Sequence, residues 1–171
     1  MSLQLYLVRH AIAEEPLEGM SDSDRRLTED GIRRMLRAAR GLRRIGVAPD
    51  RVVSSPLRRA AETAALLARV VAPGLEVEIE ASLAPGCEPA EVVRWLAAAR
   101  PQSAIALVGH QPGMGRLASF LLTGSSEAVP LSFKKGSVAS LHLRAGRSPG
   151  SAELEWYLTP RQLRAIGGKE A

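Results

Sequence analysis

An uninterrupted apolar run, AIALVG at residues 104–109, constrains the fold of this chain more than any other feature. Such a run is typical of a strand that is buried on both faces, in a sheet with helices on either side. The segment LQLYLVR, residues 3–9, indicates a second, mostly buried strand, and the short segments 51–54 and 75–79 indicate two more. The chain is therefore expected to build a sheet whose middle is shielded from solvent.

Amphipathic helices are expected between the strands, because apolar residues recur at helical spacing between recognisable start and stop signals. The starts are Thr28 as an N-cap, Ser55-Pro56, Pro89 and Pro112, and the stops are Gly46, Pro101 and Gly124. Two further strands are expected near 137–143 and 153–158, followed from Pro160 by one loose helical turn. This alternation predicts an α/β fold. We expect a single three-layer α/β/α domain over residues 1–171, with a mainly parallel central sheet and a loosely ordered tail after residue 159.

The composition narrows the class of protein. A chain of 171 residues with 46% hydrophobic and 24% charged residues has the size and balance of one globular domain. A single cysteine, Cys87, excludes an internal disulfide framework and offers no metal-ligand cluster. No metal and no other cofactor is expected. No apolar run approaches the roughly 20 residues that span a bilayer. The N-terminus also lacks the features of a signal peptide, so a cytoplasmic protein without a membrane partner is expected.

The net charge of +5 favours an anionic partner, which could be phosphate, nucleic acid or an acidic protein surface. Most of the arginines lie on helix faces that are expected to be solvated, where they need no partner. A nucleic-acid-binding protein is the least favoured class, because the arginines are scattered and only six residues are Phe, Trp or Tyr, too few for a stacking platform.

Polar residues follow three of the expected strands at the point where each strand ends. They are Arg9-His10, Ser54-Ser55 and Gly109-His110. Each has an ordinary structural explanation, such as a polar strand edge, a helix cap or a turn. In a parallel sheet, however, the working site lies outside the carboxyl ends of the strands. Two histidines and several arginines at one such edge, beside a helix N-terminus, are typical of a phosphoryl-transfer pocket.

The segments LVRHAIAE, SSPLRRAAET and LVGH resemble, in order and spacing, the three signature blocks of the histidine phosphatase superfamily, which has the phosphoglycerate-mutase-like fold. The resemblance implies that His10 is the nucleophile that accepts the phosphoryl group and that Arg9 binds its oxygens. It selects Arg59 over Arg58 as the second arginine, since Arg59 precedes the alanine of the RAxxT pattern. It makes His110 the second pocket histidine, and it implies no metal.

Both positions at which members of this superfamily carry a general acid are occupied by other residues. Ala84 and Pro85 stand where the mutase-like members have a glutamate, and Gln111 stands where the acid-phosphatase branch has an aspartate. An enzyme without this acid needs a good leaving group, and the imidazole of a phosphohistidine is one. The chain most resembles the short SixA-type phosphohistidine phosphatases, which also bring an arginine matching Arg25 to the pocket.

The expected substrate is therefore phosphohistidine on a signalling or phosphotransfer protein, with Arg25 and Ser55 as substrate-binding residues. The alternative is a small-molecule phosphomonoesterase of the same superfamily. The sequence predicts no oligomeric state.

Overall fold

The computed structural model of the protein describes residues 2–98, 104–144 and 148–168. Six strands form one sheet in the order β3-β2-β4-β1-β5-β6. Their bounds are β1 (Leu3–Arg9), β2 (Arg51–Ser54), β3 (Val77–Ile79), β4 (Ala104–Gly109), β5 (Val138–Leu143) and β6 (Ala152–Leu158). The pairs β3–β2, β2–β4 and β4–β1 are parallel, whereas β5 runs antiparallel to both β1 and β6. The expectation of a mainly parallel α/β sheet is confirmed.

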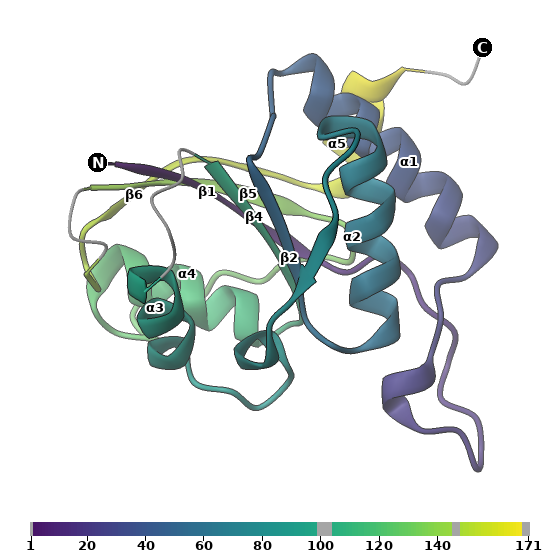
Figure 1. Ribbon diagram of the computed structural model, residues 1–171, viewed down its shortest axis with the longest axis horizontal. Coiled ribbons are helices and arrows are strands. Elements are labelled where there is room, and N and C mark those ends of the chain that lie inside the picture. Colours follow the sequence, from purple (N-terminus) through teal and green to yellow (C-terminus); the bar gives the residue numbers. More distant parts are fainter. Residues whose placement is uncertain (1, 99–103, 145–147, 169–171) are drawn as a thin grey trace.

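The described part of the chain contains five α-helices, and they cover the two faces of the sheet (Figure 1). They are α1 (Glu29–Arg44), α2 (Arg58–Val71), α3 (Pro89–Ala98), α4 (Gly113–Thr123) and α5 (Pro160–Gly167), and two short 3-10 helices are η1 (Asp22–Asp24) and η2 (Ala81–Leu83). Helices α1, α2 and α5 lie on one face, and α3 and α4 lie on the other. This gives the three layers that the alternating sequence predicts.

A hydrophobic core lies on each face of the sheet, and strands β1 and β4 contribute side chains to both cores. Leu5 and Leu7 of β1 point into the core under α3 and α4, while Val8 points into the core under α1 and α2. All six residues of β4 are buried, as expected for an apolar strand in the middle of a covered sheet. The carboxyl ends of these central strands are therefore held rigidly by packing on both faces.

Helix α2 begins later than the sequence predicts. Its first residue is Arg58, and its N-cap is Leu57, which offers no capping side chain. The hydroxyl of Ser55, expected to cap this helix, instead accepts a hydrogen bond from the Leu57 N–H at 3.3 Å and contacts His110. Strand β3 is also shorter than the expected segment 75–79.

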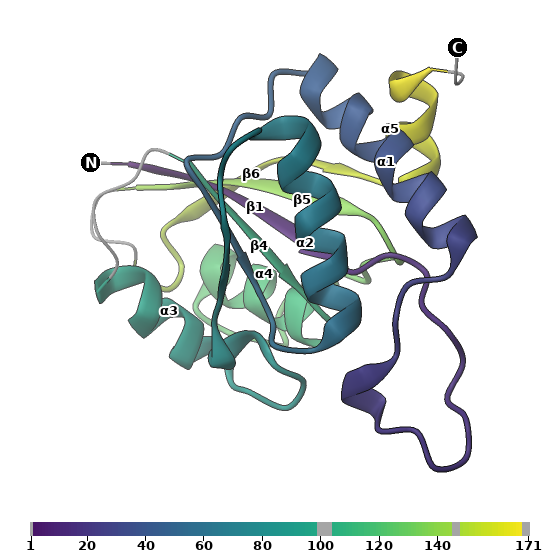
Figure 2. The same cartoon turned by 45° about the vertical axis from the view of Figure 1, so that its right-hand side comes forward.

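The expectation of a loose tail from Pro160 is wrong. Residues Pro160–Gly167 form a helix that opens with a capping box between Thr159 and Gln162. Leu163 is completely buried, and the backbones of α5 and α1 touch at Gly41 and Gly167, where no side chain separates them. Figure 2 shows α5 lying along α1. Small residues at the crossing, together with one apolar anchor, hold this short helix in place.

Pro101, the expected end of the third helix, lies outside the described residues. Across the described part of the chain, every helix is too short or too polar to span a membrane.

Candidate functional site

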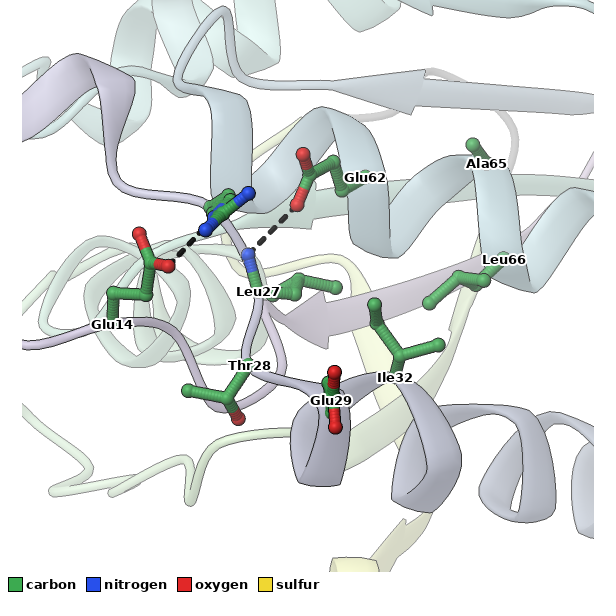
Figure 3. A pocket seen from close by; sticks show the side chains of 9 residues that line it. Glu14, Leu27, Thr28, Glu29, Ile32, Glu62, Ala65 and Leu66 are labelled. Atoms are coloured by element: carbon green, nitrogen blue, oxygen red, sulfur yellow. Dashed lines mark hydrogen bonds and ion pairs between the residues drawn. The ribbon is translucent and has the colours of Figure 1, made fainter.

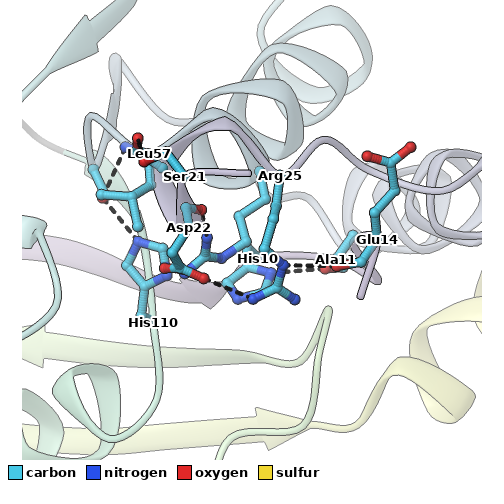
Figure 4. Close-up of polar contacts among 11 residues, drawn as sticks. His10, Ala11, Glu14, Ser21, Asp22, Arg25, Leu57 and His110 are labelled. Atoms are coloured by element: carbon cyan, nitrogen blue, oxygen red, sulfur yellow. Dashed lines mark hydrogen bonds and ion pairs between the residues drawn. The ribbon is translucent and has the colours of Figure 1, made fainter. Parts of the chain in front are cut away.

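The three polar strand ends lie at one edge of the sheet. Register places Arg9 beside Gly109 and Ser54 beside Val108, so β1, β4 and β2 end level with one another. His10 and His110 follow directly, with ring centroids 5.1 Å apart and ring planes inclined by 54°. Figure 4 shows these two rings together with residues from the loop between β1 and α1. The parallel sheet thus brings together residues that are a hundred positions apart.

His10 is held as a neutral imidazole with one particular nitrogen free. Its Nδ1–H donates to the Ala11 carbonyl oxygen at 2.7 Å, which leaves the lone pair on Nε2. Burial lowers the pKa of His10 to about 3, and the positive charges of Arg59 and Arg9 act in the same direction. The Ala11 N–H is in turn held by Thr63 Oγ1 on α2 at 3.0 Å. The Nε2 atom is therefore unprotonated and held in a fixed orientation at neutral pH, which are the properties that a nucleophilic imidazole needs.

His110 is also neutral at physiological pH, because burial, together with the positive charge of Arg59, lowers its pKa to about 4. Its Nε2 lies 2.8 Å from the hydroxyl oxygen of Ser55. Its Nδ1 is buried and has no hydrogen-bond partner among the described residues. Ser55, expected to bind substrate, is completely buried, and its hydroxyl contacts the His110 ring.

Two arginines lie beside the histidines, each anchored through the tip of its guanidinium. Arg9 Nη1 donates to the Phe133 carbonyl oxygen at 2.6 Å. Arg59 Nη1 and Nη2 donate to the backbone oxygen and to Oδ2 of Asp22, at 2.6 and 2.9 Å. In both arginines the Nε atom is buried without a partner in the described part of the chain. Arg58, by contrast, is exposed and pairs with Glu62 on the surface of α2.

Arg25 reaches this cluster through the loop that precedes α1 (Figure 4). Its Nε donates to the Glu14 carbonyl oxygen at 2.7 Å, and its Nη1 donates to Asp22 Oδ1 at 2.8 Å. One carboxylate therefore joins Arg25 to Arg59, and hydrogen bonds from these two arginines lower the pKa of Asp22. Sequence reasoning missed Asp22, because nothing in SDSDRR distinguishes Asp22 from Asp24.

The residues at the two positions where other superfamily members carry a general acid have structural roles in this protein. Gln111 Oε1 accepts from the Phe133 N–H, and its Nε2 donates to the Leu131 carbonyl oxygen, both at 3.3 Å. Ala84 ends the short helix η2. Glu88, a carboxylate four residues after Ala84, pairs with Arg116 on α4 at 3.0 Å. Among the described residues, no group of three or more His, Cys, Asp and Glu side chains is arranged to hold a metal ion.

A pocket of about 640 Å³ lies near the loop but contains none of the clustered histidines and arginines (Figure 3). The first turn of α1, the middle of α2 and the two ends of the loop form it. Its lining residues are Glu14, Arg26, Leu27, Thr28, Glu29, Ile32, Glu62, Ala65 and Leu66. Glu62 Oε2 accepts from the Leu27 N–H at 2.7 Å, which fixes the end of the loop against α2.

Residues 5–84 match the model of the histidine phosphatase superfamily, branch 1. An uncharacterized protein of Picosynechococcus sp. is 33% identical over 160 residues, which cover 91% of this chain and 94% of that protein. The chain belongs to the histidine phosphatase superfamily.

Solved structures of the superfamily agree with this membership. The protein histidine phosphatase SixA, solved in complex with tungstate, has a TM-score of 0.83 and 25% identity, covering 94% of this chain and 99% of that one. A mycobacterial glucosyl-3-phosphoglycerate phosphatase has a TM-score of 0.64 over 91% of this chain and 98% of its own, and its 21% identity shows the shared fold alone. Superfamily membership and the SixA likeness support a phosphatase activity; the identity of the substrate is a separate question.

Proposed function

We propose that this protein is a metal-independent phosphohistidine phosphatase that works through a phosphorylated His10. The observation that carries the proposal is a set of three buried nitrogens beside His10. Arg9 Nε, Arg59 Nε and His110 Nδ1 have no hydrogen-bond partner among the described residues. Buried polar groups are nearly always satisfied, so a cluster that is not indicates a ligand rich in acceptor oxygens. A phosphoryl group is such a ligand, and the similar SixA structure holds tungstate, another tetrahedral oxyanion.

The reaction proceeds in two displacements. His10 Nε2 attacks phosphorus, the bond from phosphorus to the substrate's imidazole nitrogen breaks, and the substrate ring leaves, taking a proton from solvent. Water then attacks the phosphorus on His10, the P–Nε2 bond breaks, and inorganic phosphate leaves the regenerated neutral ring. In both steps Arg9 and Arg59 offset the negative charge on the equatorial oxygens, and His110 donates a hydrogen bond to them. Arg25, linked to Arg59 through Asp22, adds a third positive charge at the rim.

The residues at the acid positions support the proposed substrate class. Ala84 offers no proton, and both polar ends of Gln111 are used to hold residues 131–133. Asp22 is the carboxylate nearest the arginines, and their hydrogen bonds lower its pKa, which keeps it ionised at neutral pH. An alkoxide leaving group would need a proton from a residue of the site, whereas the leaving imidazole can take its proton from solvent. We propose that the phosphohistidine is carried by a signalling or phosphotransfer protein.

The test is a comparison of three substrates at pH 7: a phosphohistidine-bearing protein, p-nitrophenyl phosphate and a sugar phosphate. We expect the phosphohistidine to be cleaved fastest, and His10→Ala to abolish the activity. His142→Gln, which removes the histidine of β5, is the matched control and should retain it. An acid-labile phosphate on the wild-type protein and none on His10→Ala would identify the nucleophile.

A small-molecule phosphomonoesterase is the second candidate, because the glucosyl-3-phosphoglycerate phosphatase shares this fold. Fast cleavage of the sugar phosphate, with little cleavage of phosphohistidine, would favour this candidate and refute the substrate assignment. Activity that survives His10→Ala would refute the proposed mechanism altogether.

A further inference from the structure

The two buried histidines face the same site but need different properties there, and these depend on which ring nitrogen carries the proton. A backbone carbonyl fixes His10, since only Nδ1–H can donate to the Ala11 oxygen. His110 has no such carbonyl partner among the described residues. Its ring is held at Nε2 by the hydroxyl of Ser55, a group that can either donate or accept. The direction of this one hydrogen bond therefore decides what His110 offers to a ligand.

The surroundings of Ser55 settle the direction. The Leu57 N–H donates to Ser55 Oγ at 3.3 Å, so one lone pair of the oxygen is already used. The Ser55 side chain is completely buried, and within the described ranges the acceptor within reach of its O–H is His110 Nε2. If Nε2–H donated instead, the buried O–H would lose its acceptor, and a buried donor without an acceptor is costly. The O–H therefore donates, and Nε2 carries the lone pair.

We propose that Ser55 is a positioning residue that holds His110 in its Nδ1–H tautomer, which makes His110 a neutral hydrogen-bond donor and prevents it from acting as a second nucleophile. The inference deepens the proposed function and rests on it. Both rings then have the same tautomer but present opposite atoms to the substrate. His10 presents its unprotonated Nε2, and His110 presents the N–H of its unpartnered Nδ1.

The position of Ser55 is itself well determined. Its N–H donates to the Val108 carbonyl oxygen at 2.9 Å, which continues the β2–β4 ladder past the end of β2. Its own carbonyl oxygen accepts from Ser54 Oγ at 2.8 Å, and Ser54 is also completely buried. A hydroxyl on such a fixed backbone can select one tautomer, because neither the oxygen nor the ring can move to another partner.

The first test observes the tautomer without any substrate. The ring nitrogens of ¹⁵N-histidine-labelled protein are recorded by NMR at pH 7, with His142→Gln used to simplify the spectrum. We expect protonated Nδ1 and unprotonated Nε2 in both remaining rings, and a coupling between His110 Nε2 and the Ser55 hydroxyl proton would support the same bond. A protonated Nε2 in neutral His110 would overturn the proposal.

The second test removes the hydroxyl. Ser55→Ala should abolish the Nδ1–H preference of His110, weaken binding of inorganic phosphate about 10-fold, and lower kcat for phosphohistidine about 100-fold with a smaller change in KM. Ser55→Thr, which keeps the hydroxyl, should retain the wild-type tautomer. Unchanged NMR signals and kcat in Ser55→Ala would overturn the proposal. An Nδ1–H His110 in a protein that cleaves no phosphohistidine would support the tautomer assignment while refuting the proposed function.

Discussion

The burial of His10 predicts a specific contribution to the loss of stability in acid. Its pKa is lowered from 6.5 to about 3 in the folded protein. Below pH 6.5 the unfolded chain takes up a proton on this histidine and the folded protein does not, so acidification favours the unfolded state. The free energy involved is RT ln(1 + 10^(6.5 − pH)), which is about 2 kcal/mol at pH 5 and about 0.2 kcal/mol at pH 7.

Replacing His10 by glutamine should therefore reduce the stability lost between pH 7 and pH 5 by about 2 kcal/mol, whatever the substitution does at pH 7 itself. Urea unfolding followed by the fluorescence of Trp95 and Trp156 at both pH values measures this difference. His110→Gln should behave alike, since the folded pKa of His110 is about 4. His142→Gln removes a histidine outside the site and serves as the control. If His10→Gln loses as much stability as the wild type over this interval, burial does not keep His10 uncharged, and the argument for a neutral nucleophile fails.

Three further substitutions test the arginines, the carboxylate and the docking of α5. Arg59→Lys keeps the charge but removes the buried Nε, and should lower kcat/KM for phosphohistidine about 100-fold, whereas Arg58→Lys should leave it near the wild-type value. Asp22→Asn removes a negative charge beside the anion site, so inorganic phosphate should bind several-fold more tightly in calorimetry. Weaker binding would instead mean that the carboxylate serves mainly to hold the arginines. Gly41→Ala would place a Cβ atom 2.2 Å from a backbone oxygen of α5. Overpacking costs about 1–3 kcal/mol and helix propensity returns roughly 1 kcal/mol, so urea unfolding should show a net loss of stability of up to about 2 kcal/mol. Gly113→Ala, with open space around it, should not destabilise the protein.

The sheet and the strand ends could be predicted because both depend on local patterns. Strand β4 is a continuous apolar run, and its burial on both faces follows from composition alone. Once the central strands are known to be parallel, the residues after them must share one edge. His10 and His110 are therefore brought together by topology, without any knowledge of their side-chain contacts.

The remaining features depend on contacts between segments that carry no local signal. Helix α5 is short and polar, and it is held by Leu163 and by the close approach of Gly41 to its backbone. Helix α2 begins at Arg58, and the Ser55 hydroxyl, which the sequence suggests as a helix cap, lies 2.8 Å from Nε2 of His110, a residue 55 positions further along the chain. Asp22 joins Arg25 to Arg59, and Arg59 is 37 positions further along the chain, so no local pattern indicates this contact.

Gln111 occupies a position that bears directly on the proposed substrate. It follows His110 directly, where the acid-phosphatase branch of the superfamily has its acid, yet both ends of its amide hold the segment 131–133. That segment supplies the Phe133 carbonyl oxygen, which anchors the tip of Arg9 at 2.6 Å. An aspartate here would lack the amide N–H₂ that donates to the Leu131 oxygen, so a gained acid would come with a less firmly held Arg9. Gln111→Asp should therefore lower activity on phosphohistidine without producing an efficient phosphomonoesterase. Under the proposed function, the site acts on a leaving group that takes its proton from solvent and not from a residue.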